Sequence, residues 1–174
     1  PILFYWVVAA GYHLFGVTEF AARAGSALAG LGVALVAWGV GRRWFGPATG
    51  LRAGVIVTTS VGTAAMARAS LPDLPLAFFI TAAIAAALVP LVERVPRPRR
   101  WWALSAAMAG LAVLTKGPVG VVVPAMVIGP MVWLVPRHRR PHVATFALAA
   151  GVFLAVAAPW YAAMAAVHGT GYLE

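Results

Sequence analysis

The sequence contains no cysteine, few acidic residues and little charge of either sign. The absence of cysteine excludes disulfide bonds, cysteine-ligated zinc and thiol catalysis within this chain. Only 10% of the 174 residues are charged and 63% are hydrophobic, whereas soluble domains usually carry ~25% charged and roughly 45–50% apolar residues. Because this charge deficit is too large for a water-facing surface, the sequence predicts a membrane protein.

The basic residues are grouped along the chain. Thirteen Lys and Arg against four Asp and Glu give a net charge of +9. Ten of the thirteen fall in three clusters, which are Arg42, Arg43 and Arg52; Arg94, Arg97, Arg99 and Arg100; and Arg137, Arg139 and Arg140. Long apolar runs separate the clusters, as expected for loops on one face of a bilayer. The continuous basic stripe of a nucleic-acid groove is absent, so no nucleic-acid partner is predicted.

The apolar runs define the predicted spans, because a helix needs about 20 mostly apolar residues to cross a hydrocarbon core ~30 Å thick. We predict an all-α, polytopic transmembrane helix bundle, surrounded by membrane lipids, with six spans in residues 20–163. The spans are Phe20–Gly41, Leu51–Leu71, Leu74–Val92, Trp101–Thr115, Pro118–Val135 and Val143–Ala163. Leu3–Phe15 is too short to cross, so residues 1–16 are expected to lie along the interface. Gly50 and Gly54 form a GxxxG pattern typical of close helix packing.

The three clusters also orient the bundle, because basic loop residues stay in the cytosol. With the clusters inside, the six spans alternate correctly across the membrane. Of the basic residues, only Arg23, Arg68 and Lys116 then lie on the opposite, outer side. The same topology predicts Asp73 on the outer face.

Asp73 is the first candidate for chemistry, because polar groups at a membrane are costly and need a reason. It lies in the predicted outer turn Ser70-Leu71-Pro72-Asp73-Leu74-Pro75. One interpretation is a helix cap that accepts hydrogen bonds from the first free N–H groups. The other is a carboxylate that faces an outer cavity as a general base or substrate ligand. Arg68 lies one helical turn before this segment and either pairs with Asp73 or donates to an anionic ligand.

Lys116 is the second candidate and the single lysine beside twelve arginines. It lies in Leu114-Thr115-Lys116-Gly117-Pro118, between two apolar runs. One interpretation is a tight Gly-Pro turn whose lysine extends its ammonium toward water. The other is a phosphate site, since a compact ammonium binds phosphate as a point charge.

A metal site is not supported by the sequence. His138 and His142 have the i, i+4 spacing of metal ligands. Pro141 interrupts them, and the neighbouring arginines repel a cation. The cofactor requirement is therefore open: a divalent metal is compatible with the sequence, but no ligand set indicates one.

Six motifs follow one another along the chain. They are Pro-Ile-Leu-Phe-Tyr-Trp, Leu-Phe-Gly-Val-Thr-Glu-Phe-Ala-Ala-Arg, Gly-Arg-Arg-Trp-Phe-Gly, Arg-Ala-Ser-Leu-Pro-Asp-Leu-Pro-Leu, Leu-Thr-Lys-Gly-Pro and Ala-Pro-Trp-Tyr. In this order they resemble the bacterial membrane glycosyltransferases of the protein-O-mannosyltransferase and aminoarabinose-transferase type. The resemblance covers essentially the whole chain but only part of such a protein, and it implies the polytopic GT-C fold. We therefore expect a fragment of one transmembrane domain, in which residues 1–16 end an outer loop.

The resemblance also implies a function. The donor would be a sugar linked to a polyprenyl phosphate. A lipid, protein or glycan acceptor would take the sugar at the extracytoplasmic face of the plasma (inner) membrane. In this family the turn that holds Asp73 carries an acidic residue important for activity, and the Thr-Lys-Gly turn carries an important lysine, here Lys116. A transporter or lipid-linked glycan flippase is the alternative.

The expected chemistry assigns roles to these residues. A phosphate leaves as a stable anion, so the site needs a carboxylate to deprotonate the acceptor and cations to neutralise the departing phosphate. Asp73 suits the first role, and Lys116 with Arg68 suits the second. Tyr5 and Trp6 either anchor the interface or line the entrance of the donor. The family's best-known acidic residue would precede Pro1, so we expect this piece alone to be inactive.

Overall fold

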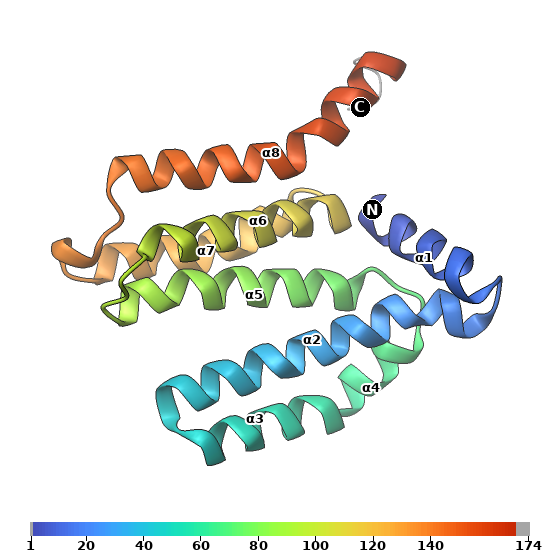
Figure 1. The fold of residues 1–174 in the computed structure, drawn as a ribbon, viewed down its shortest axis with the longest axis horizontal. Coiled ribbons are helices and arrows are strands. Elements are labelled where there is room, and N and C mark those ends of the chain that lie inside the picture. The colour runs from blue at the N-terminus through green and yellow to red at the C-terminus, as the bar shows by residue number, and fades with distance from the viewer. Residues whose placement is uncertain (1, 170–174) are drawn as a thin grey trace.

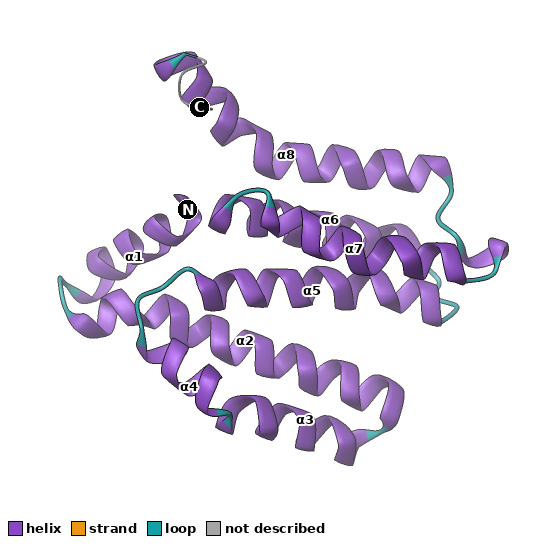
Figure 2. Ribbon diagram, turned by 180° about the vertical axis from the view of Figure 1, so that it is seen from behind, coloured by secondary structure: helices purple, strands orange, loops and turns teal. Residues whose placement is uncertain are grey.

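The computed structural model describes residues 2–169, and all their regular structure is helical (Figures 1 and 2). The helices are α1 Ile2–Phe15, α2 Glu19–Phe45, α3 Pro47–Thr59, α4 Val61–Arg68, α5 Asp73–Val92, α6 Pro98–Lys116, α7 Val119–Leu134 and α8 Val143–His168, with a 3₁₀ turn at Arg137–Arg139. The predicted all-α membrane bundle is confirmed. Helix α5 lies between α2 and α6, while α6 packs against both α7 and α8.

The predicted spans match the observed helices to different degrees. By length and composition, α2, α5 and α8 can each cross a membrane, and they cover the first, third and sixth predicted spans. Helix α6 has 19 residues and is longer than the fourth prediction, whereas α7 is a shorter apolar helix of 16 residues. Helix α1 has 14 residues, which agrees with the prediction that this segment is too short to span.

The second predicted span, Leu51–Leu71, is wrong as a single helix. The structure divides it into α3 and α4 at Ser60, whose backbone is extended. The Ser60 hydroxyl accepts a hydrogen bond from the Thr63 N–H (3.4 Å) and donates to the Val57 carbonyl (3.0 Å). Hydroxyl side chains offer the backbone such alternatives to the helical ladder, and serine is a favoured N-cap. The local polar chemistry therefore interrupts a run that is apolar on average.

Close backbone packing joins α2 to α3. A Cβ atom added at Gly50 would lie 2.5 Å from the Arg42 nitrogen and 2.6 Å from the Trp38 carbonyl oxygen. At Gly54 it would lie 3.2 Å from the Trp38 Cβ. The GxxxG prediction is thus confirmed, because any larger residue at Gly50 would have to displace backbone atoms.

The helices place the basic clusters at one end of the bundle, as predicted. Arg43 at the end of α2 forms an ion pair with Glu93, which directly follows α5. Arg94 and Arg139 line one cavity between the α5–α6 and α7–α8 connections. We call this the arginine-rich end. Helix α5 starts and α6 finishes at the opposite end, which we call the Asp73 end (Figure 1).

Candidate functional site

Asp73 and Lys116 form an ion pair at the Asp73 end, although 43 positions separate them in the sequence. Asp73 is the first residue of α5 and Lys116 the last of α6, so two antiparallel neighbours deliver the two charges. The lysine Nζ donates to one carboxylate oxygen, Oδ1. The side chains of Lys116 and Asp73 are 47% and 36% exposed. Within residues 2–169 the second carboxylate oxygen has no partner, which leaves it available to a substrate.

The first interpretation of Asp73, as a helix cap, is wrong. The N-cap position of α5 is Pro72, and no side-chain hydrogen bond caps this helix. The Asp73 carboxylate turns instead to Lys116. Its charge in the first turn still interacts favourably with the helix dipole. The carboxylate is therefore free of a capping bond and is held by a cation.

Two serines fix the loop that carries Asp73. The buried Ser26 of α2 donates from its hydroxyl to the Leu71 carbonyl at 3.1 Å. The Ser70 hydroxyl donates to the Ala22 carbonyl at 2.9 Å. These bonds tie the α4–α5 loop to α2 and set where α5 begins. The sequence offered a weak signal for Ser26, a hydroxyl within an apolar span, and its role was not predicted.

Lys116 is positioned by a sharp turn. Gly117 has a positive φ of 78°, a conformation that glycine adopts without steric cost, and its N–H donates to the Val113 carbonyl (2.7 Å). Helix α7 then packs closely on α6, since a Cβ added at Gly120 would lie 2.3 Å from the Ala112 carbonyl carbon. The predicted Gly-Pro turn is confirmed, and its lysine points to Asp73.

A cavity of about 410 Å³ lies beside the ion pair. Lys116 lines it together with Tyr5 of α1 and with Trp160 and Tyr161 of α8. Trp6 does not line this cavity but packs edge-on against Trp160, with ring centroids 5.5 Å apart. The Ala-Pro-Trp-Tyr motif pointed to the two α8 residues, but no role was predicted for them. The lysine thus faces both a carboxylate and an aromatic cavity.

A second cavity, of about 230 Å³, lies on the other side of α1 and is almost entirely apolar. Leu3 and Phe4 line it with Phe78 and Phe79 of α5. Thr115, the neighbour of Lys116, closes it toward α6. An apolar volume therefore lies near the charged pair, bounded by the residues Pro75 and Thr115 that follow Asp73 and precede Lys116.

Arg68 does not contact Asp73 in the structure. Of its two interpretations, the pairing with Asp73 is wrong, since Arg68 is exposed and makes no ion pair within residues 2–169, and donation to an anionic ligand stays a prediction. Glu19 and Arg23 form a separate, exposed i, i+4 ion pair at 3.0 Å. In the described part of the chain, no three His, Cys, Asp or Glu residues gather into a potential metal site.

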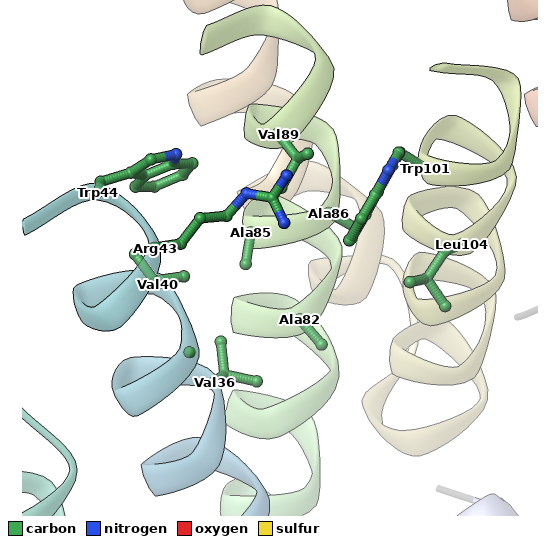
Figure 3. A pocket seen from close by; sticks show the side chains of 11 residues that line it. Val36, Val40, Arg43, Trp44, Ala82, Ala85, Ala86, Val89, Trp101 and Leu104 are labelled. Carbon is green, nitrogen blue, oxygen red and sulfur yellow. The ribbon is translucent and has the colours of Figure 1, made fainter. Parts of the chain in front are cut away.

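A third cavity, of about 290 Å³, lies near the arginine-rich end between α2, α5 and α6 (Figure 3). It is lined mainly by small apolar residues, and the Arg43 guanidinium lies between Trp44 and Trp101. The Arg43 fork binds both Glu93 oxygens, at 2.7 and 2.8 Å, and Trp44 Nε1 donates to one of them at 2.6 Å. The hydrogen bond from Arg43 lowers the pKa of Glu93 below its usual value. Glu93 does not line this cavity and Arg43 is the one ionisable residue that does, so the cavity offers no acid or base.

Comparisons with known proteins agree on one family. The family model described as dolichyl-phosphate-mannose-protein mannosyltransferase matches residues 1–162. The chain is 34% identical over its full length to an uncharacterised protein of Aquifex aeolicus, of which it covers 34%. It is 33% identical to an undecaprenyl phosphate-α-4-amino-4-deoxy-L-arabinose arabinosyl transferase of Sodalis glossinidius, with 94% of this chain and 30% of the relative covered.

A solved structure has the same fold. The structure of ArnT from Cupriavidus metallidurans bound to undecaprenyl phosphate matches 98% of this chain with a TM-score of 0.85 and 29% identity. The match covers 32% of that protein. The chain therefore spans about a third of the length of the relatives it matches.

Proposed function

Because the chain belongs to the dolichyl-phosphate-mannose-protein mannosyltransferase family, we propose that it is part of a membrane glycosyltransferase that uses a polyprenyl-phosphate sugar as donor. The acceptor is a lipid, protein or glycan with a hydroxyl or amine. The observation that carries the proposal is the ion pair of Asp73 with Lys116 beside an aromatic cavity. The likeness to a transferase structure bound to undecaprenyl phosphate supports the same donor class.

In the proposed topology, the arginine-rich end faces the cytosol of an inner (plasma) membrane. The positive-inside rule supports this orientation, because three arginine clusters share that end. Residues 20–163 form the spans, with α3 and α4 together as one interrupted span. Helix α1 lies at the outer interface and ends an outer loop. The Asp73 end is then extracytoplasmic, where acceptors of the cell envelope are found.

In the proposed reaction, Asp73 accepts the proton of the acceptor hydroxyl or amine as this group attacks the anomeric carbon. The bond between that carbon and the phosphate oxygen breaks. Polyprenyl phosphate leaves with the electron pair, and Lys116 neutralises its charge. A positioned general base contributes typically 10²–10⁴-fold, and a cation aimed at developing charge is a major stabilising element. Arg68, exposed and unpaired within residues 2–169, is a further cation for the phosphate.

The geometry suggests an exchange of partners. In the structure Lys116 binds Asp73 through one carboxylate oxygen. A donor phosphate in the adjoining cavity competes for the ammonium, since phosphate is a strong ligand for a compact cation. As Lys116 turns to the phosphate, the carboxylate is released to act on the acceptor. The resting ion pair thus keeps the two groups close until the donor binds.

The aromatic and apolar surfaces complete the proposed donor site. Tyr5 lines the cavity that holds Lys116, and Trp6 holds Trp160 in place at its wall. The apolar cavity at Phe78 and Phe79 suits the first isoprenoid units, which need a surface without polar groups. Both cavities adjoin α1, so this short helix separates the headgroup from the chain of the lipid.

The test uses the complete protein in membranes and measures sugar transfer from a panel of polyprenyl-phosphate sugars. Wild type should transfer one of them, and Asp73→Asn should lower the rate by about 100-fold or more. Glu19→Gln is the matched control, because it breaks an exposed ion pair at the same end without touching either cavity. Full activity of Asp73→Asn would remove Asp73 from the mechanism. Movement of the lipid-linked sugar across the membrane without transfer would instead support a flippase.

A further inference from the structure

A fourth cavity, of about 360 Å³, opens at the arginine-rich end, far from the proposed catalytic pair. The α5–α6 connection contributes Arg94 and the α7–α8 connection contributes Arg139 and Arg140. The one acidic residue in its lining is Glu93, and both oxygens of that carboxylate are already bound by Arg43 and Trp44 of α2. The cavity therefore has an excess of positive charge with no acid available to balance it.

The arginines are held in place but not saturated. Arg139 donates through NH1 to the carbonyls of Leu91 and Val92 at the end of α5. Arg140 donates to the Trp133 and Val135 carbonyls at the end of α7, at 2.7 and 3.3 Å. Helix capping explains these bonds. It does not explain the Nε of Arg139, which is buried without a hydrogen-bond partner in the described structure. A buried donor without a partner is costly.

An apolar groove of about 500 Å³ lies next to this basic cavity, between α6, α7 and α8. Trp102, itself buried, lines both volumes. Phe146 packs against it with ring centroids 6.0 Å apart. Small residues of α6, α7 and α8 keep the groove open, among them Ala106, Gly129 and Ala149. A cationic mouth therefore lies next to an apolar groove, and Trp102 forms part of the wall of each.

We propose that this composite site binds one anionic phospholipid, with its phosphate at Arg94 and Arg139 and an acyl chain in the groove between α7 and α8. Basic pockets between transmembrane helices on the cytosolic side recognise such headgroups. A free phosphate would use only the mouth, and an acyl chain alone would use only the groove. Because the basic cavity and the apolar groove lie side by side at Trp102, a ligand that carries both parts is favoured.

The experiment measures lipid retained by the complete purified protein, using native mass spectrometry with equal amounts of phosphatidylglycerol and phosphatidylcholine of matched chains. Wild type should retain phosphatidylglycerol preferentially. Arg94→Gln should lower that preference about fivefold, because one basic residue near an anionic lipid surface strengthens binding by about that factor. Arg97→Gln is the control, because Arg97 is exposed on the same connection and does not line the cavity. Equal retention of both lipids, or equal effects of both substitutions, would overturn the proposal.

The groove is tested separately. Gly129→Leu should displace the acyl chain and abolish retention, and it should not disturb folding because a Cβ there meets nothing within 4 Å. Gly151→Leu is the control on α8, since its Cβ position is equally open but does not line the groove. Retention of phosphatidylglycerol by Gly129→Leu at the wild-type level would contradict the proposal.

Two further outcomes distinguish other occupants. Inorganic phosphate that displaces phosphatidylglycerol from the wild-type protein would identify a free-anion site and overturn the lipid assignment. A photoreactive probe attached to Gly129→Cys should crosslink to lipid. A crosslink to another segment of the complete protein would show that the chain itself fills the groove, and would equally overturn the assignment. None of these readouts depends on sugar transfer.

Discussion

The two ends of the bundle each hold an ion pair that joins α5 to another helix, but the pairs differ in what they leave free. At the arginine-rich end, Arg43 binds Glu93 through two hydrogen bonds and Trp44 adds a third. At the Asp73 end, Lys116 reaches a single oxygen of Asp73 beside an open cavity. In the first pair both carboxylate oxygens of Glu93 already accept hydrogen bonds, so this pair works as a structural clamp between α2 and the end of α5. In the second pair one carboxylate oxygen of Asp73 has no partner in the described residues, so it can still accept a hydrogen bond from a ligand.

Charge reversal should give the largest contrast between the two pairs. Exchanging the Asp73 and Lys116 charges, with Asp73→Lys and Lys116→Asp together, keeps an ion pair possible and should preserve folding. It should lower sugar transfer by the complete protein about 100-fold, because base and cation exchange positions. The measurement is the transfer rate together with the melting temperature.

The same reversal at the other end, Arg43→Glu with Glu93→Arg, serves as the comparison. It should leave transfer largely unchanged but lower the melting temperature, since the Trp44 donor then faces a cation. Retained transfer in the Asp73 and Lys116 exchange would show that this pair is structural as well.

Removal of one clamp charge should have a smaller effect. Glu93→Gln keeps the side-chain volume but loses the bidentate acceptor of Arg43. Because both side chains are about a third exposed, we expect a loss of about 1 kcal/mol in the free energy of unfolding. Thermal unfolding of the complete protein in detergent measures it. A loss of transfer without a loss of stability would place Glu93 in the mechanism and contradict the clamp.

The smallest expected effect is a pH dependence. Arg43 holds the pKa of Glu93 below the usual glutamate value, so the carboxylate stabilises the fold above that usual value. This contribution is lost as the pH falls through the lowered pKa. The stability difference between wild type and Glu93→Gln should therefore be constant near neutral pH and shrink in acid. A difference that grows on acidification would refute this assignment.

Hydropathy and charge predicted most of the fold because both act along the chain. The apolar runs predicted the positions of α2, α5 and α8 to within a few residues. The arginine clusters predicted which helix ends lie together. The break at Ser60 was missed because a hydropathy average over a whole span does not register one hydroxyl group. The Ser60 hydroxyl competes for backbone hydrogen bonds. The motifs identified the family, and its membership is confirmed by the match over residues 1–162.

For the candidate site, the sequence indicated residues but not the contacts among them. Asp73 and Lys116 were both singled out, but not as a pair, and one interpretation of the neighbouring Arg68 made it the partner of Asp73. Sequence distance favoured Arg68, five positions away, whereas helix pairing brings Lys116 from 43 positions away. Ser26 and Trp160 were missed because their roles depend on which helix packs beside them.

The exchange of Lys116 from Asp73 to a phosphate is the central claim, and binding of undecaprenyl phosphate by the complete protein tests it most directly. Asp73→Asn should bind this lipid phosphate more tightly than wild type, because the ammonium no longer has a competing carboxylate. Lys116→Met should bind it more weakly, by about tenfold for one charge-assisted contact. Affinity changes of opposite sign would support the exchange. Unchanged affinity in both variants, or weaker binding in Asp73→Asn, would contradict it.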